Sequence, residues 1–545
     1  MSNAEPLFAQ NSRSMKTLTC LAGPVALIAM GCWSVSLGRA QPAAPVPEMP
    51  AGVAAVLTPK PAATPRINGP RVYGVRPGSP FFYAIPATGV RPMEFSIDDL
   101  PEGLKVDAAT GRITGTLAGP GEYKTVLRAR NALGAAEKPF RIVVGEDIAL
   151  TPTLGWNSYN CFGERVTQDL ALRAARQLIR LGLDQHGWTY VNMDDGWQGW
   201  KRDPVTRAIQ SDPERFTNIK AMVDEIHGMG LKAGLYHTPW VVSYGGRLGG
   251  SSQREDGNWD TTVNFKAKKN AKELPFAIGR YRFTYEDARQ FADWGFDYLK
   301  LDWGPVEAAP TREWHQALRL TGRDIVLSLS NNHIRNLFPI IADVAPWAQS
   351  WRTTTDIRDV WGRVANDIGF AQEKWAPHCR PGHYNDGDML VVGQIGGWNP
   401  NNLHPTKLTP DEQYTHISLW CLITSPLLIG CDLEKMDDFT LGLLTNDEVL
   451  EIDQDSLCRQ AVQVGGEGEL KVLAKPLEDG SLAVGLFNVG NAEATVVATW
   501  SDLKLTGRQR VRDLWRQADV GVFDEKFEAA VAPHGVKLIR LFPAQ

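Results

Sequence analysis

The chain has 545 residues, of which 43% are hydrophobic and 22% are charged, which is the composition of a globular protein with an ample core. This length exceeds one ordinary domain and predicts about two to four. The formal charge of −5 and the isoelectric point near 6.1 argue against nucleic acid or anionic lipid as electrostatically bound partners.

Residues 1–40 have the pattern of a secretory signal peptide. An apolar stretch at 18–37 follows Arg13 and Lys16 and ends in a cleavage pattern of small residues at 38–40. Proline and glycine within the stretch make it a poor membrane span. We expect export to the periplasm or the extracellular space, with a lipid anchor on Cys32 as the alternative.

Two segments follow this leader. Residues 41–65 are rich in proline and alanine and predict a semi-stiff linker. From 66 to 147, short runs of alternating hydrophobicity are separated by turn residues, which predicts a small antiparallel β-sandwich. Within it, LPEGL at 100–104 and TGRITG at 110–115 resemble the immunoglobulin-like (Ig-like) modules attached to exported bacterial proteins.

From 148 to 455 the pattern changes to short buried strands that alternate with amphipathic helices. One helix is marked by apolar residues at 219, 222, 223 and 226, and Gly230 ends it before the next strand. Eight strand candidates lie at 154–157, 190–193, 231–236, 298–301, 325–329, 351–354, 383–385 and 426–429. Such a series predicts an α/β fold, a (β/α)8 TIM barrel.

Two further segments complete the predicted organisation. Residues 239–273 are long, polar and rich in glycine, which predicts a loop over the mouth of the barrel. From 456 to 545 alternating runs return around an Asp479-Gly480 turn and predict a C-terminal antiparallel β-sandwich. The expected fold is therefore a barrel flanked by two β domains.

Charged residues gather where the predicted barrel strands end, which is the face on which barrel enzymes build active sites. These residues are Asp194 and Asp195 after the second strand, Lys300 and Asp302 on the fourth, Arg352 and Asp356 at the sixth, and Asp386 and Asp388 at the seventh. Folding alone does not account for them, because crowded like charges are destabilising.

Two chemistries use such a cluster of carboxylates, namely binding of a divalent metal and glycoside cleavage by paired carboxylates. The cluster has no histidine–carboxylate pattern, and Lys300 and Arg352 are unwanted cations in a metal site. No cysteines are spaced as metal ligands. The same cations suit recognition of sugar hydroxyls, so the residues favour a glycosidase that needs no metal or other cofactor.

Five segments of the predicted barrel are distinctive. They are TPTLGWNS at 151–158, YVNMDDGW at 190–197, YLKLD at 298–302, WRTTTDI at 351–357 and NDGDML at 385–390. Together, and in this order, they resemble glycoside hydrolase family 27, the α-galactosidases or melibiases. The resemblance spans the whole predicted barrel and implies a retaining glycosidase.

The resemblance also implies roles for individual residues. Asp302 matches the nucleophile, and Asp356 matches the acid/base that protonates the leaving oxygen and then activates water. Retention predicts that their carboxyl groups lie about 5–5.5 Å apart. Asp194 and Asp195 match the pair that binds O6 and the axial O4 of galactose. The other predicted substrate contacts are Lys300, Tyr236, Arg352 and Asp386, with Trp156 on the pocket wall.

The chain departs from the family pattern at four places. Gly196 and Trp303-Gly304 stand where many eukaryotic members carry disulfide cysteines, and the 239–273 loop has no counterpart that can be placed. The other two departures bear on the sugar. Tyr159 stands where family members commonly carry tryptophan beside the sugar O6. Ser330 lies in the segment that separates galactose from N-acetylgalactosamine specificity, and its small side chain leaves room for a 2-acetamido group.

We therefore expect exo-hydrolysis of terminal α-D-galactosyl residues on an oligosaccharide or polysaccharide. The alternatives by the same mechanism are β-L-arabinopyranosidase and α-N-acetylgalactosaminidase. A non-catalytic sugar-binding barrel and a metal-dependent hydrolase are the hypotheses from other classes.

Overall fold

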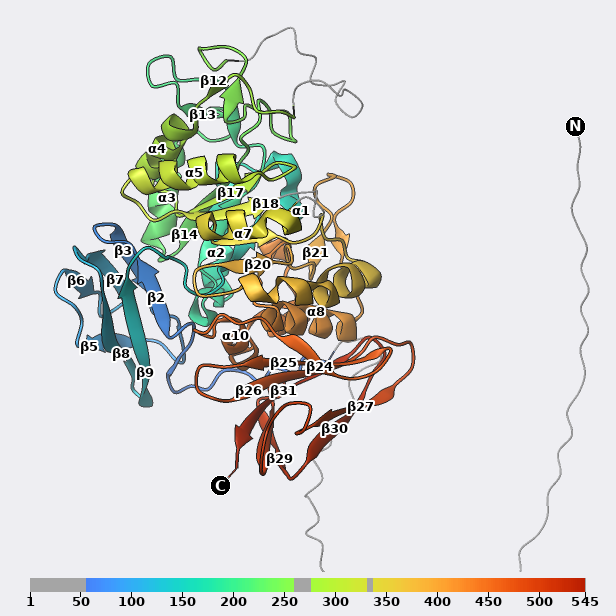
Figure 1. Ribbon diagram of the computed structural model, residues 1–545. Coiled ribbons are helices and arrows are strands. Elements are labelled where there is room, and N and C mark those ends of the chain that lie inside the picture. The colour runs from blue at the N-terminus through green and yellow to red at the C-terminus, as the bar shows by residue number, and fades with distance from the viewer. Residues whose placement is uncertain (1–54, 259–275, 331–336, 545) are drawn as a thin grey trace, which may run out of the picture. The chain divides into compact units, whose positions relative to one another are not determined.

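The computed structural model describes residues 55–258, 276–330 and 337–544 (Figure 1). The predicted signal peptide, residues 41–54 of the predicted linker and residues 259–273 of the predicted loop lie outside this part. Within the described ranges, no helix combines the length and the apolar character needed to cross a bilayer.

The N-terminal domain is an Ig-like sandwich, because alternating side chains give each sheet one apolar face to bury. One sheet has the order β2 (Val72–Val75), β9 (Gly134–Val144), β8 (Gly121–Asn131) and β5 (Glu94–Asp98); the other is β3 (Pro80–Ala84), β7 (Arg112–Thr116) and β6 (Leu104–Val106). Phe81, Ile113, Leu127 and Ile142 belong to the core between them. The predicted sandwich is present, but β2 pairs parallel with β9 rather than antiparallel. A short pair, β1 (Arg66–Ile67) and β4 (Ala87–Thr88), lies beside the sheets.

The central domain is a barrel of eight parallel strands, which confirms the predicted fold class. In spatial order these are β20 (Tyr384–Asp386), β19 (Ser350–Arg352), β18 (Val326–Ser330), β17 (Tyr298–Asp302), β14 (Lys232–His237), β11 (Tyr190–Met193), β10 (Leu154–Asn157) and β23 (Leu427–Ile429). Leu390, shortly after β20, connects the two ends of this series by a parallel bridge to Ile429. Most strands are buried at every position, since helices cover their outer faces.

Helices alternate with these strands along the chain. The α-helices in the described part of the chain are α1 (Tyr159–Phe162), α2 (Gln168–Arg180), α3 (Ile219–Gly228), α4 (Thr284–Trp294), α5 (Ala308–Leu320), α7 (Ile341–Val344), α8 (Pro410–Leu422), α9 (Asp438–Leu444) and α10 (Asp447–Asp453). The predicted helix α3 begins after Asn218, whose side chain accepts from the Ala221 N–H, and Gly230 beyond its end has a left-handed φ of +88°. Between β19 and β20 the chain forms a π-helical turn (Arg363–Ile368) and 3-10 turns (Gly369–His378).

The C-terminal domain is the predicted antiparallel β-sandwich. Its larger sheet has the order β24 (Val462–Gly465), β25 (Leu470–Pro476), β26 (Leu482–Asn488), β31 (Val536–Pro543), β28 (Gln509–Asp513) and β29 (Ala518–Phe523), and β27 (Ala494–Thr499) pairs with β30 (Lys526–Val531). Helix α8 lies between this domain and the barrel, and almost all of its residues are buried. Trp515 of the domain donates its indole N–H to Ser418 of α8.

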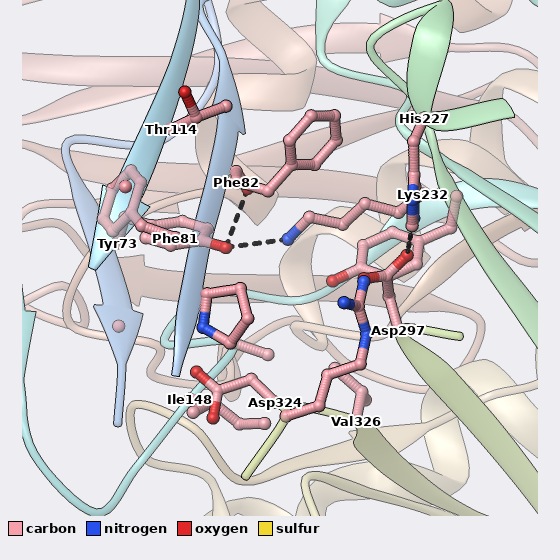
Figure 2. Close-up of a pocket in the computed structure, with 16 residues that line it drawn as sticks. Tyr73, Phe81, Phe82, Thr114, Ile148, His227, Lys232, Asp297, Asp324 and Val326 are labelled. Carbon is pink, nitrogen blue, oxygen red and sulfur yellow. Dashed lines mark hydrogen bonds and ion pairs between the residues drawn. The ribbon is translucent and has the colours of Figure 1, made fainter. Parts of the chain in front are cut away.

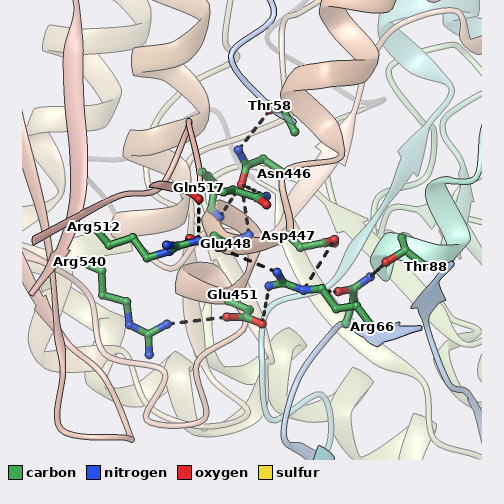
Figure 3. A network of polar contacts seen from close by, with 12 residues as sticks. Thr58, Arg66, Thr88, Asn446, Asp447, Glu448, Glu451, Arg512, Gln517 and Arg540 are labelled. Atoms are coloured by element: carbon green, nitrogen blue, oxygen red, sulfur yellow. Dashed lines mark hydrogen bonds and ion pairs between the residues drawn. The ribbon is translucent and has the colours of Figure 1, made fainter. Parts of the chain in front are cut away.

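Acidic residues of α10 join the three domains (Figure 3). Glu451 pairs with Arg66 of the Ig-like domain at 3.1 Å and with Arg540 of the C-terminal domain at 3.7 Å. Glu448 binds the Arg512 guanidinium through both of its oxygens, each at 2.7 Å. A shared helix therefore holds both β domains against the barrel through bidentate and bridging charge pairs.

The chain between β14 and α4, described at residues 238–258 and 276–283 and called the extension below, lies at the carboxyl ends of the strands. It is anchored by a fully buried ion pair, Arg202 to Asp287 at 2.5 Å, and Arg202 also donates to the Gly249 carbonyl at 2.6 Å. Asp287 belongs to α4 and Arg202 ends the hairpin strand β12 (Gln198–Arg202), which pairs with β13 (Ile209–Ser211). In the extension, β15 (Ser251–Ser252) pairs with β16 (Tyr281–Arg282). The described part of the predicted loop is therefore an ordered structure rather than a loose connection.

Candidate active site

The carboxyl ends of the barrel strands meet around a polar pocket. Its lining includes the side chains Asn157, Lys300, Ser328, Ser330, Arg352, Asp386 and Asp388. Strand register explains part of this set, because Lys300 lies opposite Tyr236 and Ser328, and Asp302 lies opposite Ser330. Inward-facing residues of parallel strands thus form layers at the face where barrel enzymes place their chemistry.

Asp194 is the best-satisfied carboxylate at this face. Its Oδ2 accepts from Lys300 Nζ at 2.7 Å and from Asn157 Nδ2 at 2.9 Å, and its Oδ1 accepts from the Asp195 N–H at 2.9 Å. Burial opposes the charge on Lys300, but Asp194 and Asp302 together raise the pKa of its ammonium group. The contact between Asp194 and Lys300 therefore fixes the direction of both side chains.

Asp195 is held by the extension over the mouth. Its Oδ2 accepts from the Gly245 N–H at 2.6 Å and is hydrogen-bonded by Ser243. Its Oδ1 is buried and has no hydrogen-bond partner among the described residues. Burial raises the pKa of Asp195 to about 7. Asp194 contacts the pocket residues Asn157 and Lys300, whereas Asp195 contacts the extension. The two neighbours can differ in this way because the strand has ended, and Gly196 turns the chain with a φ of +113°.

Asp302 is the last residue of β17 and is only 7% exposed. Its Oδ1 has no hydrogen-bond partner in the described part of the chain, and neither has the hydroxyl of buried Tyr236. Burial raises the pKa of Asp302 to about 6; the Lys300 charge opposes the rise, and the Asp356 and Asp194 charges add to it. Both atoms lie near the carboxyl ends of the barrel strands, where barrel enzymes bind their substrates, so they are candidates for contact with a polar ligand.

Asp356 differs from Asp302 in its exposure. Its side chain is 72% exposed, whereas that of the neighbouring Arg352 is 4% exposed. The Arg352 guanidinium lies 3.3 Å from Asp356 and 2.6 Å from Asp388. Asp388 is held by the N–H groups of Ile357 and Met389, at 2.7 and 2.8 Å. Arg352 therefore links the exposed carboxylate to a buried, rigid one.

Asp386, Tyr159 and Ser330 are three further predicted residues at this face. Burial raises the pKa of Asp386 to about 6, and its Oδ1 accepts from the Asp388 N–H at 2.7 Å. Tyr159 opens α1, and burial together with the Asp194 and Asp195 charges raises the pKa of its phenol. Ser330 ends β18 and lines the pocket.

Trp156 does not line this pocket, so the expectation that it forms the pocket wall is wrong. Its side chain is fully buried among the helices around α2, and its indole N–H donates to the Cys431 carbonyl at 2.9 Å. Successive residues of a strand face opposite sides, so Asn157 and not Trp156 reaches the pocket. The alternation of side chains along the strand could therefore have identified Asn157 from the sequence.

Sequence reasoning also missed other residues of the site. Asp388 was visible in the motif after the seventh strand but was not assigned a role. Ser243 and Gly245 had no local signal, because their contact with Asp195 depends on how the extension folds back. Among the described residues, no group of three or more histidine, cysteine, aspartate and glutamate side chains is arranged to hold a metal ion.

Comparison with known families adds an independent observation. The family profile described as α-galactosidase A matches residues 151–269 and 276–455, and the α-galactosidase C-terminal β-sandwich profile matches residues 467–541. The chain belongs to glycoside hydrolase family 27. An Ig-domain profile matches residues 64–145, ahead of this glycoside hydrolase.

Individual relatives of this family-27 enzyme agree. Alpha-galactosidase 2 of Arabidopsis thaliana is 34% identical, over 74% of this chain and 92% of its own length. A candidate α-galactosidase from Bacteroides fragilis has a similar structure, with 31% identity, a TM-score of 0.77, and coverage of 90% of this chain and all of its own. A family-27 β-L-arabinopyranosidase from Geobacillus stearothermophilus is 27% identical, with a TM-score of 0.63 over 73% of this chain and 98% of its own.

Proposed function

We propose that this family-27 enzyme removes terminal α-D-galactosyl residues from galactosides with retention of configuration. One observation supports this most: buried Asp302 keeps an unpartnered carboxylate oxygen beside Lys300, while Asp356 at the same face is open to solvent. A retaining glycosidase needs one carboxylate protected for attack and another that exchanges protons with the leaving group and water.

In the first step Asp302 acts as the nucleophile. Its carboxylate oxygen attacks the anomeric carbon and forms a glycosyl ester, while the bond from that carbon to the leaving oxygen breaks. Asp356 gives its proton to that oxygen and becomes a carboxylate. Asp302 must be ionised for this attack, and the Lys300 charge favours that form against the effect of burial.

The second step reverses these roles. Asp356 takes a proton from a water molecule, whose oxygen attacks the anomeric carbon and displaces the Asp302 carboxylate. The products are the free sugar and an enzyme with both carboxyl groups in their starting states. Attack on opposite faces in the two steps returns the original configuration.

Selection of galactose is assigned to the aspartate pair. The free Oδ1 of Asp195 accepts a hydrogen bond from the axial O4, and Asp194 contacts O6. A glucoside places O4 equatorially and leaves a buried carboxylate oxygen without a donor, which is unfavourable. Small Ser330 beside Asp302 favours α-N-acetylgalactosaminidase activity as the second candidate, because it leaves space near O2.

A panel of aryl glycosides tests the proposed glycone. The α-galactoside should be hydrolysed best, with the α-N-acetylgalactosaminide and the β-L-arabinopyranoside as comparators. Release of the β-anomer first, seen by NMR, would contradict retention, whereas turnover of none of the three would contradict the proposed activity.

We also propose that the enzyme is exported and meets its oligosaccharide or polysaccharide substrate outside the cytoplasm. The leader pattern of residues 1–40 supports this. The N-terminal sequence of protein recovered from the periplasm or the medium tests it, with cleavage after Ala40 as the expected result. Protein that keeps the leader in the cytoplasm would contradict export, whereas a lipid on Cys32 would contradict cleavage after Ala40 and show the anchored alternative.

A further inference from the structure

A second cavity lies at the opposite end of the barrel, between the amino ends of its strands and the Ig-like domain (Figure 2). It has a volume of about 300 Å³. Tyr190, Lys232 and Val326 contribute from the starts of three barrel strands, and Tyr73 and Phe82 from the Ig-like domain. Cavities at domain interfaces, from about this size upward, are common positions for small-molecule sites.

Lys232 is the distinctive residue of this cavity. It is 9% exposed, and Figure 2 shows it extending from the barrel toward Tyr73. Its Nζ donates to the Tyr73 hydroxyl at 2.8 Å and lies 4.9 Å and 5.4 Å from the ring centres of Tyr73 and Tyr190. No carboxylate of the described residues lies within 4.0 Å of it. A buried ammonium is normally paired with an anion, because water no longer stabilises its charge.

The neighbouring carboxylates are already occupied. Asp297 accepts from the Ala233 N–H at 3.0 Å and from Arg323 at 2.6 Å, and His227 lies 2.8 Å from it. Burial opposes ionisation of Asp297, but His227, Arg323 and Lys232 lower its pKa. Asp324 is bound by the side chain and the backbone N–H of Arg76, at 2.6 and 3.0 Å.

The charges around the cavity therefore do not balance. Lys232 and Arg323 are the cations of the lining, and Asp297 and Asp324 are its carboxylates. Arg323 pairs with Asp297, and Arg76, which lies outside the lining, pairs with Asp324, so both carboxylates are neutralised by arginines and Lys232 is not. One positive charge is left over, which fits a monoanion better than a phosphate carrying nearly two charges at neutral pH. The aromatic rings beside Lys232 also provide flat apolar surfaces, on which the C–H face of a ring can pack.

We propose that this cavity binds a small organic carboxylate, with Lys232 pairing its anionic group and the aromatic rings packing against its carbon skeleton. The site is separate from the catalytic face and does not depend on the proposed activity. The carboxylate can belong to a simple acid or to a sugar acid, and both chemistries are probed directly.

Calorimetric titration of the whole protein tests this at neutral pH and constant ionic strength, with galacturonate, acetate, galactose and inorganic phosphate as separate ligands. Galacturonate should bind most tightly and acetate more weakly, while galactose should not compete with galacturonate. Phosphate that binds as tightly as galacturonate, or no saturable binding of either carboxylate, would overturn the proposal.

Variants locate the binding. Lys232→Met should lower the affinity for galacturonate at least about tenfold, because one charged hydrogen bond is lost. The same variant should hydrolyse an aryl α-galactoside at the unaltered rate. Lys220→Met is the matched control, because Lys220 is exposed on α3 and pairs with Asp224. Asp302→Asn should not change galacturonate binding, so this site and the proposed activity fail independently.

A crystal structure with galacturonate gives a reading that does not depend on how the variants fold. Density for the carboxylate within hydrogen-bond distance of Lys232 Nζ is the expected result. A ligand found only at the carboxyl ends of the strands would overturn the proposal.

Discussion

Asp297 immediately precedes the barrel strand β17 and Asp302 is its last residue, and each is 7% exposed. The pKa of Asp297 is lowered, because His227 and Arg323 outweigh its burial, whereas that of Asp302 is raised to about 6. Equal burial with opposite shifts means that the partners decide the outcome. At the amino end the protein satisfies its buried charge, and at the carboxyl end it leaves one oxygen unsatisfied, where a barrel enzyme meets its substrate.

The largest expected effect is that of substituting Asp302, at the carboxyl end of β17. Asp302→Asn should lower turnover of an aryl α-galactoside by on the order of 10⁴-fold or more, because the amide does not form the glycosyl ester. Steady-state rates measured beside Asp297→Asn provide the check. Substantial turnover by the Asp302 variant would remove it from the role of nucleophile.

The second effect concerns the amino end. Asp297→Asn should destabilise the fold by about 2–4 kcal/mol, because Arg323 keeps a buried charge without its partner. Melting temperature at pH 7 measures this, and turnover below the melting transition should stay near the unaltered value. Asp224→Asn on the exposed face of α3 is the control. Equal stability of the Asp297 variant and the control would show that the Asp297 carboxylate, although it has hydrogen-bond partners, contributes little to folding stability.

The third effect is the dependence of folding stability on pH, which should differ between Asp302 and Asp297. A rise in the pKa of Asp302 from 3.8 to about 6 corresponds to about 3 kcal/mol of preference for the neutral form. The contribution of the protonated Asp302 carboxyl group to folding stability is fully present below the unfolded pKa. It is lost as the pH rises through the folded pKa of about 6. Asp302→Asn, which does not titrate, should therefore melt at a higher temperature than the unaltered protein at pH 7.

This gain should shrink toward pH 4, which a series of melting curves would follow. A gain that does not depend on pH would point to repacking instead. For Asp297 we expect the opposite dependence of stability on pH, because its pKa is lowered in the folded protein. Its stabilising contribution is present above the unfolded pKa and is lost as the pH falls through the folded pKa.

The smallest effect compares two carboxylates at the catalytic face itself. Asp194 has donors on both oxygens, whereas Asp195 keeps a free Oδ1. Asp195→Ala should reduce the preference for α-galactoside over α-glucoside by about 1.5–3 kcal/mol, roughly tenfold to a few hundredfold. Ratios of kcat/KM on the two aryl glycosides measure it. A larger loss of preference in Asp194→Ala would reverse the assignment of O4 and O6.

The sequence by itself determined the eight-stranded barrel, the two flanking β domains and the strand ends that carry Asp194, Asp302, Arg352 and Asp386. These follow from strand and helix periodicity, which is local, and from motifs that span few residues. The resemblance to the family suggested Trp156 for the pocket wall, whereas the structure places Asn157 in the pocket and Trp156 outside it, as the alternation of side chains along a strand requires.

Only the tertiary structure decided how each buried charge is compensated. Gly245 contacts Asp195 from the extension, and Arg323 contacts Asp297 from the segment between α5 and β18. Tyr73 contacts Lys232 from another domain. None of these contacts has a signal in the residues next to the charge. Desolvation and hydrogen bonding depend on the complete set of neighbours in space, so the difference between Asp297 and Asp302 appears only once the chain is folded.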